Sequence, residues 1–181
     1  MPVTKSVTVY QYAELSDKAK EKAREWYRSS GECYHWGEEN IASLKAFAEW
    51  FNIEIKCYSL GGSDNRDNHV KAELNCDDNL LELSGVRLWK YMQNQMVLPK
   101  LDGDCPFTGY GLDENLLDPI RSFIKRPVIG MTWRGIIKEC LDAFVTAYVA
   151  DVDYAYSDEA VTENIEANEY EFTVDGDRYR Y

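Results

Sequence analysis

The sequence predicts an α+β fold in which a small, mainly antiparallel sheet is packed by several helices. Three observations lead to this prediction. Short segments alternate apolar and polar residues, as half-buried strands do. Longer segments repeat apolar residues every three or four positions, as amphipathic helices do. The chain has 181 residues, of which 45% are hydrophobic and 13% aromatic. That is enough apolar material for the core of one domain covering residues 1–181.

The N-terminal part predicts one strand followed by two helices. Residues 6–12 alternate apolar and polar side chains and predict the strand. In the first helix, Ser16 is the expected N-cap, and Gly31 can end the helix. A second helix is predicted over residues 38–51. The residues expected to face inward are Ala19, Ala23, Trp26, Tyr27, Ile41, Leu44, Phe47, Ala48 and Phe51.

The middle of the chain predicts two strands and one helix. Residues 53–59 and 69–75 show the period of two that strands require, and the polar sequence LGGSDNRDN between them predicts a wide loop. Ser84 is a candidate N-cap for a helix over residues 85–96. The apolar residues expected to pack from this helix are Val86, Leu88, Trp89, Met92 and Met96.

Two more helices are predicted after a turn-rich connection at residues 99–111. They cover residues 113–125 and, after Thr132, residues 133–152. The expected core residues of the second are Trp133, Ile136, Ile137, Cys140, Leu141, Phe144, Tyr148 and Val152.

The C-terminal part predicts a short acidic helix. Ser157 is its candidate N-cap, and Val161 and Ile165 are expected to pack inward. The helical spacing then places three carboxylates in one acidic ridge, namely Glu159, Glu163 and Glu166.

A hairpin is predicted after this helix, because Asp175–Gly176 is a strong signal for a two-residue turn. With a two-residue turn, Phe172 faces Tyr179 and Glu171 faces Arg180.

The net charge of −12 is concentrated near the C-terminus. Residues 139–177 contain twelve acidic residues and no Lys or Arg, so the rest of the chain has 32 − 12 = 20 acidic residues against 20 basic ones. This acidic composition argues against direct binding to nucleic acid or to an anionic membrane, since both require a basic surface. The stretch 139–177 is therefore expected to form an acidic face.

The sequence lacks the patterns that catalytic, metal or cofactor sites require, and we expect a non-enzymatic protein without cofactor or metal. Residues 102–114 and 151–162 begin like calcium loops, but Phe107 and Tyr156 stand where such a loop needs glycine. The five cysteines contain no C-x-x-C pair, which is typical of reduced, mostly buried thiols in a cytoplasmic protein. An enzyme that uses Cys105 or His69 remains an alternative.

Three blocks of the sequence resemble a group of small acidic proteins encoded by phages and prophages. The blocks are ELSDKAKEKAREWYR, CPFTGYGLDENLLDPI and CLDAFVTAYVADVDYAYSDEAVTENIEANEYEFTVDG, and they cover somewhat over a third of the chain. Some members of this group are labelled antitoxins of toxin–antitoxin systems. The resemblance implies a protein of the host bacterial cytoplasm and brings no catalytic residues with it.

Charge and resemblance together predict a phage inhibitor of a bacterial defence system, similar to anti-CRISPR or anti-restriction proteins. Its partner would be a host defence protein or nucleoprotein complex with a basic groove, which the acidic face would occupy in place of nucleic acid. A homodimer is compatible with this function. The alternative binding mode is an antitoxin-like apolar interface using tyrosines such as Tyr154, Tyr156 or Tyr170. The predicted partner-binding residues are Asp151, Asp153, Asp158, Glu159, Glu163, Glu166, Glu169 and Glu171.

Overall fold

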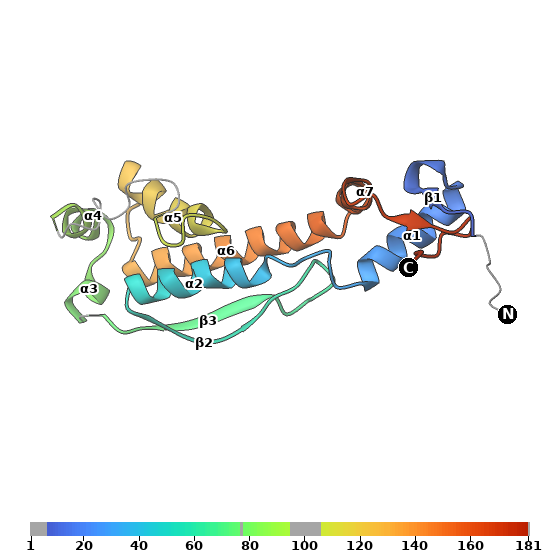
Figure 1. The fold of residues 1–181 in the computed structure, drawn as a ribbon. Coiled ribbons are helices and arrows are strands. Elements are labelled where there is room, and N and C mark those ends of the chain that lie inside the picture. Colours follow the sequence, from blue (N-terminus) through green and yellow to red (C-terminus); the bar gives the residue numbers. More distant parts are fainter. Residues whose placement is uncertain (1–6, 77, 95–105, 181) are drawn as a thin grey trace. The chain divides into compact units, whose positions relative to one another are not determined.

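The computed structural model describes residues 7–76, 78–94 and 106–180. The chain folds into two compact units (Figure 1). The terminal unit is formed by both ends of the chain, Met1–His35 and Val152–Tyr181, and the central unit by Trp36–Asp151. The single domain over residues 1–181 stays a prediction.

Helices and antiparallel strands build both units, which confirms the predicted α+β class. The described residues contain seven α-helices, and their four strands pair into two separate antiparallel sheets, β1 with β4 and β2 with β3. The elements are β1 (Tyr10–Gln11), η1 (Tyr12–Glu14), α1 (Asp17–Ser29), α2 (Gly37–Trp50), β2 (Ile53–Ser59), β3 (His69–Leu74), α3 (Asp78–Glu82), α4 (Gly85–Asn94), α5 (Asp113–Lys125), α6 (Trp133–Ala155), α7 (Asp158–Ala167) and β4 (Glu171–Phe172).

In the terminal unit, α1 and α7 pack their apolar faces against each other. The Ser16 side chain caps α1 as predicted, accepting a hydrogen bond from the Ala19 amide at 3.4 Å. The predicted strand at residues 6–12 is shorter in the structure: β1 ends at Gln11, and a 3₁₀ turn follows because the Gln11 amide donates to the Glu14 carboxylate at 2.8 Å. The buried residues of this unit are Tyr12, Leu15, Ala19, Ala23, Tyr27, Cys33, Val161, Ile165 and Phe172.

The C-terminal hairpin differs from its prediction by one residue in register. Phe172 pairs with Arg178, and the Tyr179 amide donates to the Glu171 carbonyl at 2.8 Å. The predicted pairs of Phe172 with Tyr179 and of Glu171 with Arg180 are therefore wrong. Gly176, at φ +83°, adds a third residue to the loop, which is the usual way a three-residue hairpin closes.

In the central unit, α2 and α6 run antiparallel, with the β2–β3 hairpin against them (Figure 1). The antiparallel arrangement follows from contacts at both ends. Near the start of α2, Trp36 and Asn40 donate to the Asp151 carboxylate late in α6, and after its end Phe51 packs against Trp133 at the beginning of α6, with 5.6 Å between the ring centroids. The two strands match the predicted segments, and Ile53, Ile55, Ala72 and Leu74 contribute to the core.

Helix α4 packs through only part of its predicted apolar set. Leu88 and Met92 are buried, and the Trp89 indole donates to the Ile124 carbonyl of α5 at 2.9 Å. Val86 is 56% exposed, so its predicted packing is wrong. Helix residues two positions apart point in different directions, so Val86 cannot share a face with Leu88. Met96 lies outside the described residues, and α3 was not predicted.

A buried carboxylate organises the loop before α5. Asp113 is fully buried, and its Oδ2 accepts hydrogen bonds from the amides of Phe107, Thr108 and Gly109 at 3.0, 2.7 and 3.2 Å. The Thr108 hydroxyl donates to Oδ1 at 3.0 Å. The sequence predicted only a turn-rich connection here, whereas the structure shows a loop whose residues 107–109 all bind the Asp113 carboxylate.

Candidate interaction surface of the terminal unit

Helix α7 presents its predicted acidic ridge on a fixed scaffold. The Ser157 side chain accepts a hydrogen bond from the Ala160 amide at 3.2 Å, which confirms it as the N-cap. Val161 and Ile165 are completely buried, as predicted. Because the opposite face of the helix is locked into the core, the outward side chains start from a rigid backbone.

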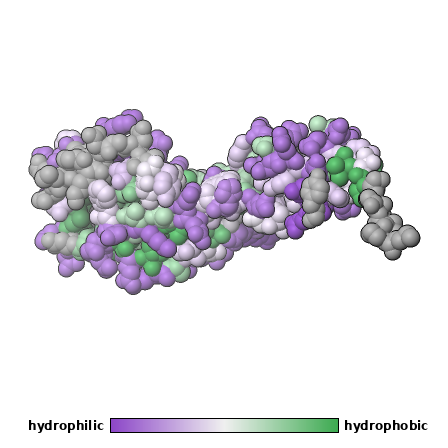
Figure 2. Space-filling view, in the orientation of Figure 1, coloured by the Kyte–Doolittle hydropathy of each residue, from purple (hydrophilic) through white to green (hydrophobic). Residues whose placement is uncertain are grey.

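Glu159, Glu163 and Glu166 are all exposed on this helix. None of the three forms an ion pair with a described residue. The space-filling view is largely hydrophilic over α7 (Figure 2). We call these three residues the α7 ridge. Their negative charges are available to a partner.

Asp158 and Asp151 are engaged within their own units. Arg28 of α1 donates to the Asp158 carboxylate and to the Tyr156 carbonyl, and the Arg24 guanidinium lies 3.6 Å from Asp158. Asp158 therefore joins the start of α7 to α1. Asp151 belongs to the central unit, where its Oδ2 accepts from the Trp36 indole at 2.7 Å and from the Asn40 amide at 2.8 Å. These contacts give both carboxylates a structural role, and their role in partner binding stays a prediction.

The other three predicted residues lie at the ends of α6 and α7. Asp153 is exposed on the last turns of α6. Glu169 is exposed and adopts φ +51°, the left-handed conformation that often ends a helix. Glu171 is half-buried in β4, opposite Gln11. The stretch 139–177 thus contributes to both units, with residues 139–151 in the central unit and 152–177 in the terminal unit.

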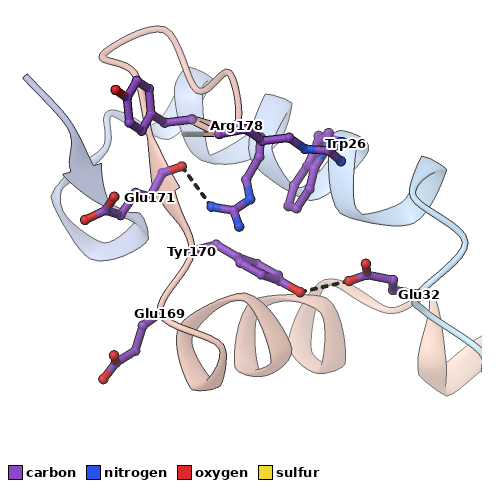
Figure 3. Close-up of a pocket in the computed structure, with 8 residues that line it drawn as sticks. Trp26, Glu32, Glu169, Tyr170, Glu171 and Arg178 are labelled. Atoms are coloured by element: carbon purple, nitrogen blue, oxygen red, sulfur yellow. Dashed lines mark hydrogen bonds between the residues drawn. The ribbon is translucent and has the colours of Figure 1, made fainter. Parts of the chain in front are cut away.

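A cavity of about 590 Å³ lies beside Glu169 and Glu171 (Figure 3). The Arg178 guanidinium stacks in it, with its carbon 4.2 Å from the centroid of Tyr170 and 5.4 Å from that of Trp26. Its Nη1 donates to the Glu171 carbonyl at 3.4 Å. Stacking on aromatic rings is a favourable placement for a guanidinium. The cavity combines aromatic walls with charges of both signs, which suits binding a polar side chain.

Tyr170 is held in this cavity by a hydrogen bond from its hydroxyl to the Glu32 carboxylate at 2.8 Å (Figure 3). Burial raises the pKa of the Tyr170 hydroxyl, and the bond to Glu32 raises it further. Tyr170 therefore keeps its proton at neutral pH and acts as a donor.

Sequence reasoning did not place Trp26, Glu32 or Arg178 at this surface. Trp26 was expected in the core, but it is half-buried and packs edge-on against Tyr170, with centroids 5.3 Å apart. Well over a hundred residues separate Trp26 and Glu32 from Arg178. Only the pairing of the two chain ends brings these residues together, and no local pattern signals it.

The structure also bears on the residues of the alternative enzyme, Cys105 and His69, and on metal and membrane sites. Cys105 lies outside the described residues. His69 lies next to a different thiol, that of Cys57, at 4.0 Å between Nε2 and Sγ. No group of three or more His, Cys, Asp or Glu in the described part of the chain could hold a metal ion. Among the helices that the structure describes, none has both the length and the apolar character of a membrane span.

Comparisons with known proteins found no relative of the chain. No family model matches the chain, and no match was found among curated proteins or solved structures.

Proposed function

We propose that the chain is a phage-encoded, non-enzymatic inhibitor of a bacterial defence system, acting in the host cytoplasm. The α7 ridge would bind a basic, nucleic-acid-binding surface of the target. The observation that supports this most is the exposure of three carboxylates without internal ion pairs on a helix whose other face is fully buried. Because the helix backbone is already ordered, a partner that binds these charges incurs no further cost for ordering the backbone.

The spacing of the ridge allows partial mimicry of a phosphate strand. A helix rises about 1.5 Å per residue, so Glu159 and Glu163 are about 6 Å apart along the axis, and Glu163 and Glu166 about 4.5 Å. Phosphates follow one another at about 3.4 Å of axis along each strand of duplex DNA. The ridge alone is sparser than DNA. Exposed carboxylates of the same unit, such as Asp153 and Glu169, would add to the charge.

Charge reversal of the ridge tests the proposal. The full chain is mixed with purified nucleic-acid-binding proteins of bacterial defence systems, and displacement of labelled duplex DNA is measured. We expect the wild type to displace DNA from its target, and the Glu159→Lys, Glu163→Lys, Glu166→Lys variant to lose this ability. The wild-type effect should weaken between about 50 and 500 mM salt, because exposed charges are screened.

A matched control separates the ridge from net charge. Glu49, Asp118 and Glu139 are exposed in the central unit, and reversing all three changes the formal charge by the same +6, from −12 to −6. This control should still displace DNA. A ridge variant that displaces DNA as well as the wild type would contradict the proposal.

One observation favours the antitoxin-like alternative, in which apolar contacts dominate. Tyr154 and Tyr156 are 53% and 40% exposed, and tyrosine is a frequent anchor of protein interfaces. Tyr170, the third candidate, is instead held by Glu32 and Arg178. If this alternative holds, replacing Tyr154 and Tyr156 with serine should weaken partner binding at both salt concentrations, while the ridge variant binds normally.

A further inference from the structure

A β-bulge turns one cysteine of the central unit toward solvent. In the β2–β3 pair, Ile53 lies opposite Leu74 and Ile55 opposite Ala72, but Cys57 lies opposite Lys71, which leaves Lys56 as an extra residue. Side chains alternate between the faces of a strand, so one extra residue moves every later side chain to the other face. Without the bulge, Cys57 would point inward with Ile53 and Ile55. With it, Cys57 is exposed.

Two basic residues share the exposed face with this thiol. Lys71 is the direct cross-strand neighbour of Cys57. His69, two residues before Lys71, lies on the same face, with its Nε2 4.0 Å from the Cys57 sulfur. Lys56 does not join them, because it pairs with Glu54 and Glu73 at 2.7 and 3.0 Å.

The hydrogen bond on the far side of the imidazole defines which nitrogen can accept a proton. His69 Nδ1 lies 2.7 Å from the Asp67 carbonyl oxygen and 3.3 Å from its carboxylate. A carbonyl oxygen only accepts, so Nδ1 of the neutral ring carries the proton and donates it. The unprotonated Nε2 then faces the thiol of Cys57. A thiol, a base and an acceptor that orients the base form the arrangement that activates nucleophiles.

The loop between the strands holds this arrangement in place. Asn68 accepts from the Gly61 amide at 2.8 Å and donates to the carbonyls of Gly62 and Asn65 at 3.0 and 2.8 Å. The Asn65 side chain accepts from the Asp67 amide at 3.2 Å. These bonds position the residue that orients His69.

We propose that Cys57 is a reactive thiol that forms mixed disulfides with small disulfide compounds. His69 Nε2 takes the Cys57 proton, and the thiolate attacks one sulfur of the disulfide. A new S–S bond forms to Cys57 while the original S–S bond breaks, and the departing thiolate is protonated, so that one protein thiol and one disulfide give one mixed disulfide and one free thiol. Lys71 and the protonated imidazole stabilise the attacking thiolate.

Two other thiols are excluded from this chemistry by burial. Cys33 and Cys140 are buried, and desolvation raises the pKa of both. A protonated, inaccessible thiol does not react with disulfides. Among the described cysteines, this leaves Cys57 and the half-buried Cys76 as the accessible ones.

The test measures the rate at which the full chain reacts with the aromatic disulfide DTNB. We expect one fast phase at pH 7, which Cys57→Ser abolishes and His69→Asn slows at least about tenfold, because the variant lacks the general base. At strongly alkaline pH the rates of wild type and His69→Asn should converge, because hydroxide can replace the imidazole as the base. Incubation with glutathione disulfide should add one glutathionyl group, located at Cys57 by mass spectrometry.

Cys76→Ser and Cys105→Ser are the matched controls and should keep the fast phase. Circular dichroism verifies that each variant is folded. We expect Cys57→Ser to fold normally, because the side chain it replaces is exposed. Survival of the fast phase in Cys57→Ser would overturn the proposal. So would equal rates for wild type and His69→Asn across the pH range, since the imidazole would then have no part in the reaction.

Discussion

Replacing Gly176 with alanine is expected to destabilise the terminal unit by about 3 kcal/mol. Two effects add. Gly176 has φ +83°, and a side chain in this left-handed conformation costs about 1–2 kcal/mol. A Cβ at this position would also lie 2.3 Å from the Ala19 carbonyl oxygen of α1, so the hairpin would have to move away from the helix. Overpacking of this kind typically costs about 1–3 kcal/mol. Urea denaturation measures the loss.

Gly31 provides the matched control for this prediction. It belongs to the same unit and has nearly the same φ of +81°, but a Cβ there would meet no atom within 4 Å. Gly31→Ala should therefore show only the conformational cost, about 1–2 kcal/mol. Hydrogen exchange should show lost protection in α1 and the hairpin of Gly176→Ala, with α2 and α5 unchanged. Equal destabilisation by the two substitutions would mean that the contact with Ala19 contributes nothing.

The second large effect is expected for Asp113→Ala, which should destabilise the central unit by about 3–5 kcal/mol. The substitution removes the shared acceptor of three backbone amides and one hydroxyl. Each shielded donor left without a partner costs about 1–3 kcal/mol, and water recovers part of this, most readily at Gly109, which is exposed. Thermal unfolding and hydrogen exchange of the amides at residues 107–109 are the measurements.

Two further variants identify the cause. Asp113→Asn keeps the volume of the side chain, but its amide offers only one neutral oxygen as acceptor. Its NH₂ group also adds donors where other donors already converge. The stability of this variant should therefore lie between those of the wild type and Asp113→Ala. Thr108→Val removes the hydroxyl contact with Asp113 together with the contacts to Ser43 and Tyr110, but keeps the amide donors, and should cost about 1–2 kcal/mol. If Asp113→Ala were no worse than Thr108→Val, the carboxylate would not be organising the loop.

Local patterns in the sequence predicted the helices well. Ser16 and Ser157 both cap the helices they precede, and Val161 and Ile165 are buried as their spacing requires. Each of these features depends on residues within one or two helical turns, where propensity and periodicity act. The exposure of the α7 ridge follows from the same spacing.

Features that depend on how two segments of the chain pair were missed or predicted wrongly. The bulge at Lys56 and the one-residue change in the hairpin register each alter which side chains face each other, and an alternating pattern does not reveal either. Asp158 contacts two arginines of α1, and one of them, Arg28, lies 130 residues before it in the sequence. A carboxylate in the sequence carries no sign of whether a distant arginine will neutralise it.

The assembly of the terminal unit from both chain ends has a consequence for synthesis in the cell. Helix α1 leaves the ribosome well before the residues that cover its apolar stripe, Val161, Ile165 and Phe172, have been made. At about 5–20 residues per second, α1 waits roughly 8–30 s for them. A 13-residue helix is only marginally stable alone. Ala23 and Tyr27 therefore stay accessible to chaperones and proteases until residues 161–172 have been made, and a chain that ends before them would leave both side chains exposed.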